Sequence, residues 1–214
     1  MKRELEHLLP ADIERRSFEI IAAELAERGI ALPEETASVV KRVIHTTADF
    51  DYAENLAFSP GVVETARAAL RAGAAVVTDT QMARAGINKT SLARFGGEAR
   101  CFMSDPDVAA MAKENGTTRA VASMDKASAL SGPLLFAVGN APTALIRLCE
   151  LVSEGRLCPA AVIGVPVGFV NVVEAKELLL ESGVPCIVAR GRKGGSNVAA
   201  AIVNALLYGM EGGR

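Results

Sequence analysis

Short apolar runs recur at intervals through the last two thirds of the chain, and longer segments with apolar residues at helical spacing lie between them. Each run spans five residues, which suits a strand buried on both faces. Alternation of such strands with helices is typical of repeated βαβ units. The pattern predicts an α/β fold, with a mainly parallel five-stranded sheet and helices on both faces. The predicted strands are residues 74–78, 99–103, 134–138, 160–164 and 186–190.

Two of the intervening helices have clear ends in the sequence. Asp105 precedes Pro106, a pair typical of a capped helix N-terminus, and Gly116 is a stop signal for the same helix. Asn171 begins another helix and Gly183 ends it.

The first 73 residues have a different pattern, which predicts three helices and no strand. These helices span about residues 12–28, 34–46 and 60–72. Their expected boundaries are Gly29 after the first, Pro33 before the second, and a Ser59 cap and Gly73 around the third. No linker-like segment separates this helical section from the βα repeats of residues 74–214. We therefore expect residues 1–214 to form one domain, in which the helical extension covers the sheet or reaches a second subunit.

The composition narrows the classes of function. Half of the 214 residues are hydrophobic but only 4% are aromatic and none is Trp, so the core must be mostly aliphatic. Lys and Arg number 23 against 25 Asp and Glu, and this formal charge of −2 offers no basic field for a nucleic acid. No apolar run approaches the roughly 18 residues of a membrane span, and the first residues do not resemble a signal peptide. We expect a cytosolic protein with no nucleic-acid or membrane partner.

Several common site chemistries have no matching motif. Cys101, Cys149, Cys158 and Cys186 lack a close metal-ligand spacing such as C-x-x-C, so we interpret the cysteines as reduced core residues and expect no metal site. The sequence also contains no dinucleotide fingerprint, phosphate-binding P-loop, zinc-protease motif or serine-hydrolase motif.

Ligands of open parallel sheets bind beyond the carboxyl ends of the strands. Residues 191–197, GRKGGSN, follow the last predicted strand there, and their glycines would let backbone N–H groups approach an anion. The same composition suits an ordinary loop with solvated basic side chains, and the sequence leaves both interpretations open. Arg119 and Arg190 are candidate carboxylate partners, although single arginines also commonly form surface ion pairs.

The sequence has two histidines. His7 lies in a charged N-terminal stretch and is expected to be exposed to solvent. His45 lies at the end of a predicted helix, where the helix dipole stabilises a protonated imidazole and favours a proton donor near neutral pH. On spacing alone, a structural role for His45 is favoured over a catalytic one.

Longer stretches of the chain resemble one known family, the precorrin-8X methylmutases of cobalamin biosynthesis, which include enzymes for cobalt-precorrin-8. The resemblance covers nearly the whole chain in order. It is carried by IERRSFEII (13–21), VIHTTADFDY (43–52), TDTQMARAGINK (78–89), GNAPTAL (139–145), GVPVGFVNVVEAKE (164–177) and GRKGGSNVAAAIVNALL (191–207).

This resemblance implies a homodimeric α/β isomerase that needs no added cofactor. The family moves a methyl group from carbon 11 to carbon 12 of a corrin precursor, and the histidine of its V-I-H segment protonates the macrocycle. That histidine corresponds to His45 here. A methyl migration requires no nucleophile, metal or hydride carrier, which agrees with the motifs that are missing.

The resemblance also implies which residues contact the corrinoid, whose rim carries many carboxylates that arginines, hydroxyls and amides can bind. Asp49 and Asp79 either orient His45 or cap helices. Gln81 stands where an acidic residue is expected in many relatives, so no carboxylate role is assigned there. The candidate substrate contacts are Arg16, Ser17, Asn88, Lys89, Arg119, Asn140 and Arg190.

Two other functions remain as alternatives to the isomerase. One is a corrinoid carrier that sequesters a product without catalysis. The other is a phosphosugar-binding or nucleotide-binding protein built around residues 191–197. The sequence does not distinguish a metal-free substrate from its cobalt complex.

Overall fold

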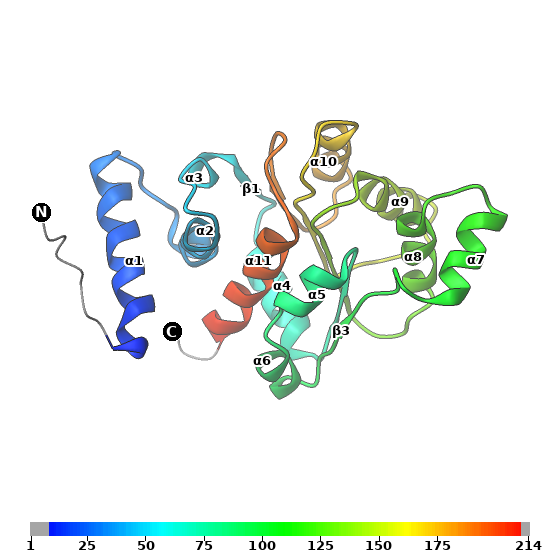
Figure 1. Ribbon diagram of the computed structural model, residues 1–214, viewed down its shortest axis with the longest axis horizontal. Helices are drawn as coiled ribbons and strands as arrows, with labels where there is room; N and C mark the ends of the chain where they lie inside the picture. The colour runs from blue at the N-terminus through cyan, green and yellow to red at the C-terminus, as the bar shows by residue number, and fades with distance from the viewer. Residues whose placement is uncertain (1–8, 211–214) are drawn as a thin grey trace, which may run out of the picture.

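The computed structural model describes residues 9–210, in which a six-stranded sheet lies between layers of helices (Figure 1). The strand order is β1-β6-β5-β4-β2-β3, and all neighbours are parallel except β1, which is antiparallel to β6. The register pairs Val76 with Leu135 and Ile163 with Ile187. The strands are β1 (Leu56–Phe58), β2 (Ala75–Thr78), β3 (Ala99–Arg100), β4 (Leu134–Val138), β5 (Ala161–Gly164) and β6 (Cys186–Ala189).

The helices fill the rest of the described chain between short loops. In chain order they are α1 (Pro10–Glu27), α2 (Glu34–Thr47), α3 (Tyr52–Asn55), α4 (Val62–Arg71), α5 (Gln81–Gly86), α6 (Lys89–Arg94), α7 (Pro106–Glu114), α8 (Arg119–Ser128), α9 (Pro142–Ser153), α10 (Val172–Glu181) and α11 (Ser196–Met210).

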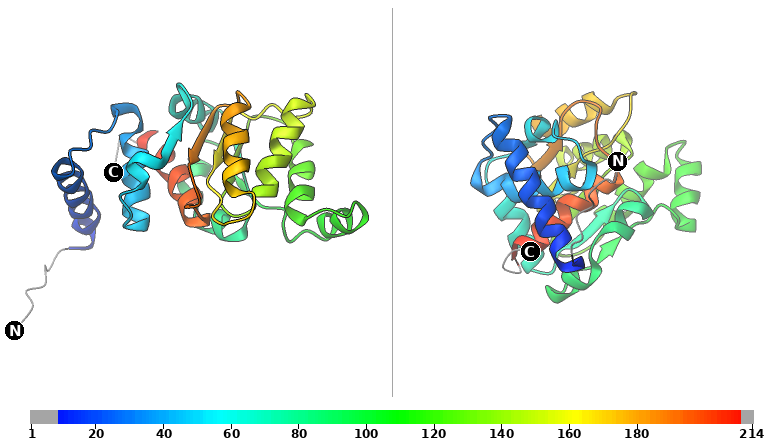
Figure 2. Two further views of the ribbon diagram at one scale, coloured as in Figure 1. Left: turned by 90° about the horizontal axis from the view of Figure 1, so that it is seen from above. Right: turned by 60° about the vertical axis from the view of Figure 1, so that its left-hand side comes forward.

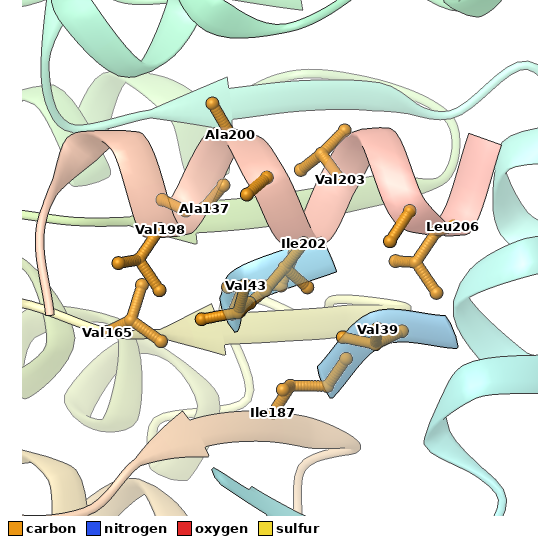
Figure 3. Close-up of a cluster of buried hydrophobic side chains, with 14 of the residues drawn as sticks. Val39, Val43, Ala137, Val165, Ile187, Val198, Ala200, Ile202, Val203 and Leu206 are labelled. Carbon is orange, nitrogen blue, oxygen red and sulfur yellow. The ribbon is translucent and has the colours of Figure 1, made fainter. Parts of the chain in front are cut away.

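One face of the sheet is covered by α4 and α11, and α2 packs on α11. The reason is visible in α11, where apolar residues occur on nearly every side, as expected of a helix buried all round. Figure 3 shows part of this core, with Val198, Ile202 and Leu206 of α11 gathered with Val39 and Val43 of α2. Helix α2 is thereby fixed to the body of the protein through its apolar side.

The other face of the sheet is covered by α8, α9 and α10. Leu145 and Leu148 of α9 and Leu179 of α10 are buried there against Phe136 and Val162. Helix α1 lies at one end of the molecule, outside α2, and α7 lies at the other end (Figures 1 and 2). The predicted α/β domain with helices on both faces is therefore confirmed.

The predicted strand count is wrong by one. The additional strand, β1, lies in the section expected to be wholly helical and has only three residues, too few for a recognisable period. It adds an antiparallel edge to β6. The strand predicted at 99–103 is shorter than expected and ends at Arg100.

One predicted helix cap is wrong, and another is confirmed in position but not in its hydrogen bond. Gly61 rather than Ser59 precedes α4, and the Ser59 hydroxyl instead accepts a hydrogen bond from the backbone N–H of Cys186 at 2.8 Å. Asp105 does precede α7, but its carboxylate binds the Lys126 ammonium at 2.7 Å and makes no cap. In both cases a tertiary partner competes successfully for the capping group.

The cysteines agree with the expectation only in part. Cys101, Cys149 and Cys186 are buried and unpaired, whereas Cys158 is exposed and is not a core residue. Within residues 9–210, no group of three or more His, Cys, Asp or Glu side chains is arranged to hold a metal ion. No helix of that part of the chain is long and apolar enough to cross a membrane.

Candidate active site

His45 lies in the last turn of α2, on the side of the helix away from its buried stripe. Val39, Val40, Val43 and Ile44 form that stripe, so the next residue in sequence faces outward and is exposed. The imidazole stacks on the ring of Phe18 from α1, with 5.2 Å between ring centroids and 27° between planes. No described residue forms a hydrogen bond with its ring nitrogens. The ring is thus held on one face while its nitrogens remain accessible.

A series of contacts continues from Phe18 through partly buried side chains of α2 and α11. The Arg42 guanidinium lies 4.6 Å from the centroid of Phe18 and 5.1 Å from that of Tyr208, and it pairs with Glu14. The Tyr208 hydroxyl in turn accepts a hydrogen bond from the Asn88 side chain at 3.2 Å. These contacts join α1, α2 and α11 and extend to the start of α6.

Asp79 lies at the carboxyl end of β2 and is completely buried. Its carboxylate accepts hydrogen bonds from the backbone N–H groups of Gly139, Asn140 and Ala141 at 2.7–2.8 Å. Burial raises the pKa of the carboxyl group, and the three N–H groups oppose that shift. Asp79 therefore fixes the turn that begins α9, and it does not contact His45.

Residues 191–197, the glycine loop, lead from β6 into the first two residues of α11, and several of their polar groups already have partners within the chain. The Lys193 ammonium binds the carboxylates of Asp49 and Asp51 at 2.6 and 2.5 Å. The N–H of Gly195 donates to the carbonyl of Val165 at 2.9 Å, and a Cβ on Gly194 would collide with that same carbonyl oxygen. These contacts favour the ordinary-loop interpretation over an open anion site, and they give Asp49 a partner other than His45.

The candidate residues of α1 lie on different sides of that helix. Arg16 shares a groove with Ile20 and Ala23 on the face turned away from α2 and interacts with Glu19 at 3.6 Å. Ser17 donates its hydroxyl hydrogen bond to the carbonyl of Ile13 at 2.9 Å. Within one chain, Arg16 therefore does not face His45.

Asn88 and Lys89 begin α6. The Asn88 side chain caps that helix by accepting from the N–H of Ser91 at 3.0 Å, besides its contact with Tyr208, and Lys89 is exposed. Among residues 9–210, a series of contacts links Asn88 to His45 through Tyr208, Arg42 and Phe18.

Arg119, Asn140 and Arg190 lie where the parallel strands end, and all three are exposed. Arg119 begins α8, Asn140 follows β4 and Arg190 follows β6. His45 reaches the same end of the molecule, because Asp49 contacts the glycine loop. His7 lies outside the described residues.

Exposed apolar side chains at this end were missed in the sequence. Val167, Phe169 and Val170 follow β5, and the Phe169 side chain is 81% exposed. The Arg192 guanidinium lies 5.4 Å from the Phe169 ring centroid. Their position within the GVPVGFVNVVEAKE stretch did not indicate exposure, because apolar residues of this kind also form buried strands.

Gln81, at the start of α5, donates weakly to the Cys101 carbonyl and the Ser104 hydroxyl at 3.5 and 3.4 Å.

Comparisons with known proteins agree with this architecture. The family model for precorrin-8X methylmutase matches residues 12–209. A cobalt-precorrin-8 methylmutase of Salmonella typhimurium is 50% identical over 94% of this chain and 96% of its own. A precorrin-8X methylmutase of Pseudomonas aeruginosa is 41% identical over 93% of this chain and 95% of its own. A solved precorrin-8X methylmutase from Thermus thermophilus is 40% identical, covers 95% of this chain and all of its own, and superposes with a TM-score of 0.85.

The fold and these similarities together define an α/β isomerase of cobalamin biosynthesis. The chain belongs to the precorrin-8X methylmutase family. The resemblance noted in the sequence is thereby confirmed, and catalysis is favoured over a carrier role.

Proposed function

We propose that this chain moves a methyl group from carbon 11 to carbon 12 of precorrin-8X or its cobalt complex, with His45 as the proton donor. The observation that carries the proposal is the exposed imidazole of His45, stacked on Phe18 and without a hydrogen-bond partner among the described residues. A donor must reach the proton acceptor with a free nitrogen, and a ring supported on one face keeps its orientation.

The reaction is an isomerisation, so no atom is gained or lost overall. His45 gives a proton to the conjugated ring, and the methyl group leaves carbon 11 as its bond to carbon 12 forms. At the end of turnover the ring returns a proton to His45, which restores the imidazolium. The protein must otherwise hold a large flat molecule still.

The end of the sheet offers groups of the right chemistry for that task. Phe169 and Val167 present apolar surface to a flat ring, and Arg190 and Arg192 offer guanidinium groups to rim carboxylates. We include Arg119 and Asn140, at the same end, among the substrate contacts. Asn88 and Lys89 remain candidate substrate contacts, but they are farther from His45 and lie beyond Tyr208 in the series of contacts.

The test compares wild type with His45→Ala by absorption spectroscopy and chromatography, on both precorrin-8X and cobalt-precorrin-8. Relatives carry both names at similar identity, so both substrates are required. Removal of a general acid lowers turnover by about 10²–10⁴-fold, and we expect that loss with little change in binding. The control is Thr46→Ala, which alters an exposed neighbour on the same helix.

Turnover by His45→Ala at the wild-type rate would refute the assigned proton donor. Tight binding by wild type with a spectral change but without conversion of either substrate would instead indicate a carrier.

We also infer a homodimer, in which Arg16 and Ser17 of one subunit approach the His45 site of the other. The outward face of α1 supports this, because Ile13 and Ile20 are 52% and 47% exposed and lie on one stripe with Arg16. Leu9, directly before the helix, is 72% exposed. Light scattering at micromolar concentration should give twice the mass of the chain, and Ile13→Glu should shift the protein toward monomer. A monomeric wild type would refute the inference. The cytosolic location predicted from the sequence stays a prediction.

A further inference from the structure

Lys176 is a charged residue in an apolar layer. It lies on the buried side of α10 with Val172, Ala175 and Leu179, and its side chain is completely buried. No carboxylate among the described residues pairs with it, and burial lowers the pKa of its ammonium to about 8. A buried, unpaired lysine costs folding free energy, so its presence needs another explanation than packing.

The partners of Lys176 are both in the glycine loop. Its ammonium donates hydrogen bonds to the carbonyls of Gly191 at 2.7 Å and Lys193 at 2.8 Å. The loop is also held by its neighbour, since the N–H of Gly168 donates to the Arg192 carbonyl at 3.2 Å. Lys176 thus fixes the backbone of Lys193 from beneath.

The side chain of Lys193 leads from this loop to the end of α2. It binds Asp49 and Asp51 in the turn that follows His45. Within that turn, Ala48 is in the left-handed region with φ 54°, and the N–H of Asp51 donates to the Asp49 carboxylate at 3.0 Å. Phe50 also packs against the core, so the pairs with Lys193 add to a turn that is already partly held. Asp49 is only four residues beyond His45, so the pairs with Lys193 act on the segment in which α2 ends.

We propose that Lys176 is a positioning residue for the methyl migration, which acts through the glycine loop and Lys193 to hold the C-terminal turn of α2, and with it His45. Lys176 does not touch the reacting atoms in this scheme. The inference rests on the proposed function for its kinetic measurement only.

The experiment compares Lys176→Met and Lys193→Met with wild type, and Lys113→Met serves as the control because that lysine is exposed at the end of α7, far from the site. Misplacement of a catalytic group by about 1 Å can cost up to roughly 10²-fold in rate. We expect kcat to fall about tenfold or more in both variants with KM changed less than about threefold. The double variant should be no slower than the slower single variant, because both changes interrupt one connection.

Amide hydrogen exchange provides a measurement that does not depend on activity. Exchange in residues 46–51 should accelerate in Lys176→Met and in Lys193→Met, and not in Lys113→Met. If wild type converted neither substrate, the proposed function would be refuted. The exchange pattern would still test whether Lys176 and Lys193 hold the end of α2.

Three results would overturn the proposal. The first is wild-type kcat in folded Lys176→Met. The second is an increase in KM alone for Lys193→Met, which would make Lys193 a direct substrate contact. The third is a pair of defects that multiply in the double variant. If Lys176→Met does not fold, the result for Lys193→Met decides whether the proposal stands. Wild-type kcat in that exposed-site variant would overturn it, because Lys193 links the glycine loop to the end of α2.

Discussion

Asp79 and Lys176 hold two adjoining loops where the parallel strands end, and they do so by opposite means. Asp79 accepts three hydrogen bonds from N–H groups at the start of α9, whereas Lys176 donates two to carbonyls before α11. The loops touch, since a Cβ on Gly139 would lie 2.7 Å from the Cα of Ser196. Each buried side chain thus provides hydrogen bonds to backbone groups that have no partner in the backbone itself.

The difference between them lies in what the fixed loop carries. The carboxylate of Asp79 occupies the N–H groups that would otherwise bind an external anion, so it completes the scaffold at the point where the strand order reverses. Lys176 leaves the side chain of Lys193 directed toward Asp49 and Asp51. Asp79 therefore blocks a potential anion-binding site, whereas Lys176 connects the glycine loop to α2, the helix that carries His45.

The largest expected effect on stability comes from Asp79→Asn. An amide offers one acceptor oxygen, and its NH₂ group would face backbone donors, leaving buried N–H groups unsatisfied. We expect the free energy of unfolding to fall by about 2–4 kcal/mol, measured by urea denaturation. Asp107→Asn is the matched control, because that carboxylate is exposed and pairs with Lys126 at the surface. Equal midpoints for the two variants would contradict the scaffold role of Asp79.

A second effect concerns pH and Lys176. Its pKa is about 8 in the folded chain and 10.5 for an ordinary lysine, so below pH 8 both states are charged. Between these values the unfolded chain retains a proton that the folded chain has released, and the free energy of unfolding rises with pH, by at most about 3 kcal/mol. The stability of wild type relative to Lys176→Met should therefore increase from pH 7 to pH 10. Parallel pH curves for the two proteins would show that Lys176 is not desolvated.

The same two regions show how far the sequence alone leads. Apolar runs predicted five of the six strands because buried parallel strands have a strong signal, and β1 escaped because three residues on an antiparallel edge have none. Lys176 was not singled out in the sequence, because its burial on α10 and its two carbonyl partners become evident only in the structure. The contact between Lys193 and Asp49 joins residues 144 apart, which no local pattern encodes. For His45, the spacing favoured a structural role, and only the resemblance indicated a catalytic one.

The smallest expected effect comes from Asp51→Asn, and it separates stability from positioning. Asp51 is 62% exposed on its side chain, and surface ion pairs of this kind contribute about 0–1 kcal/mol. The free energy of unfolding should therefore change by less than about 1 kcal/mol, and the difference should vanish in about 1 M salt, where charges are screened within about 3 Å. Asp49 remains to bind Lys193, and that hydrogen bond lowers the pKa of the Asp49 carboxyl group, so the connection weakens without breaking. A loss as large as that of Asp79→Asn would mean that the turn after α2 supports the fold itself, and the contrast between the two buried charges would no longer hold.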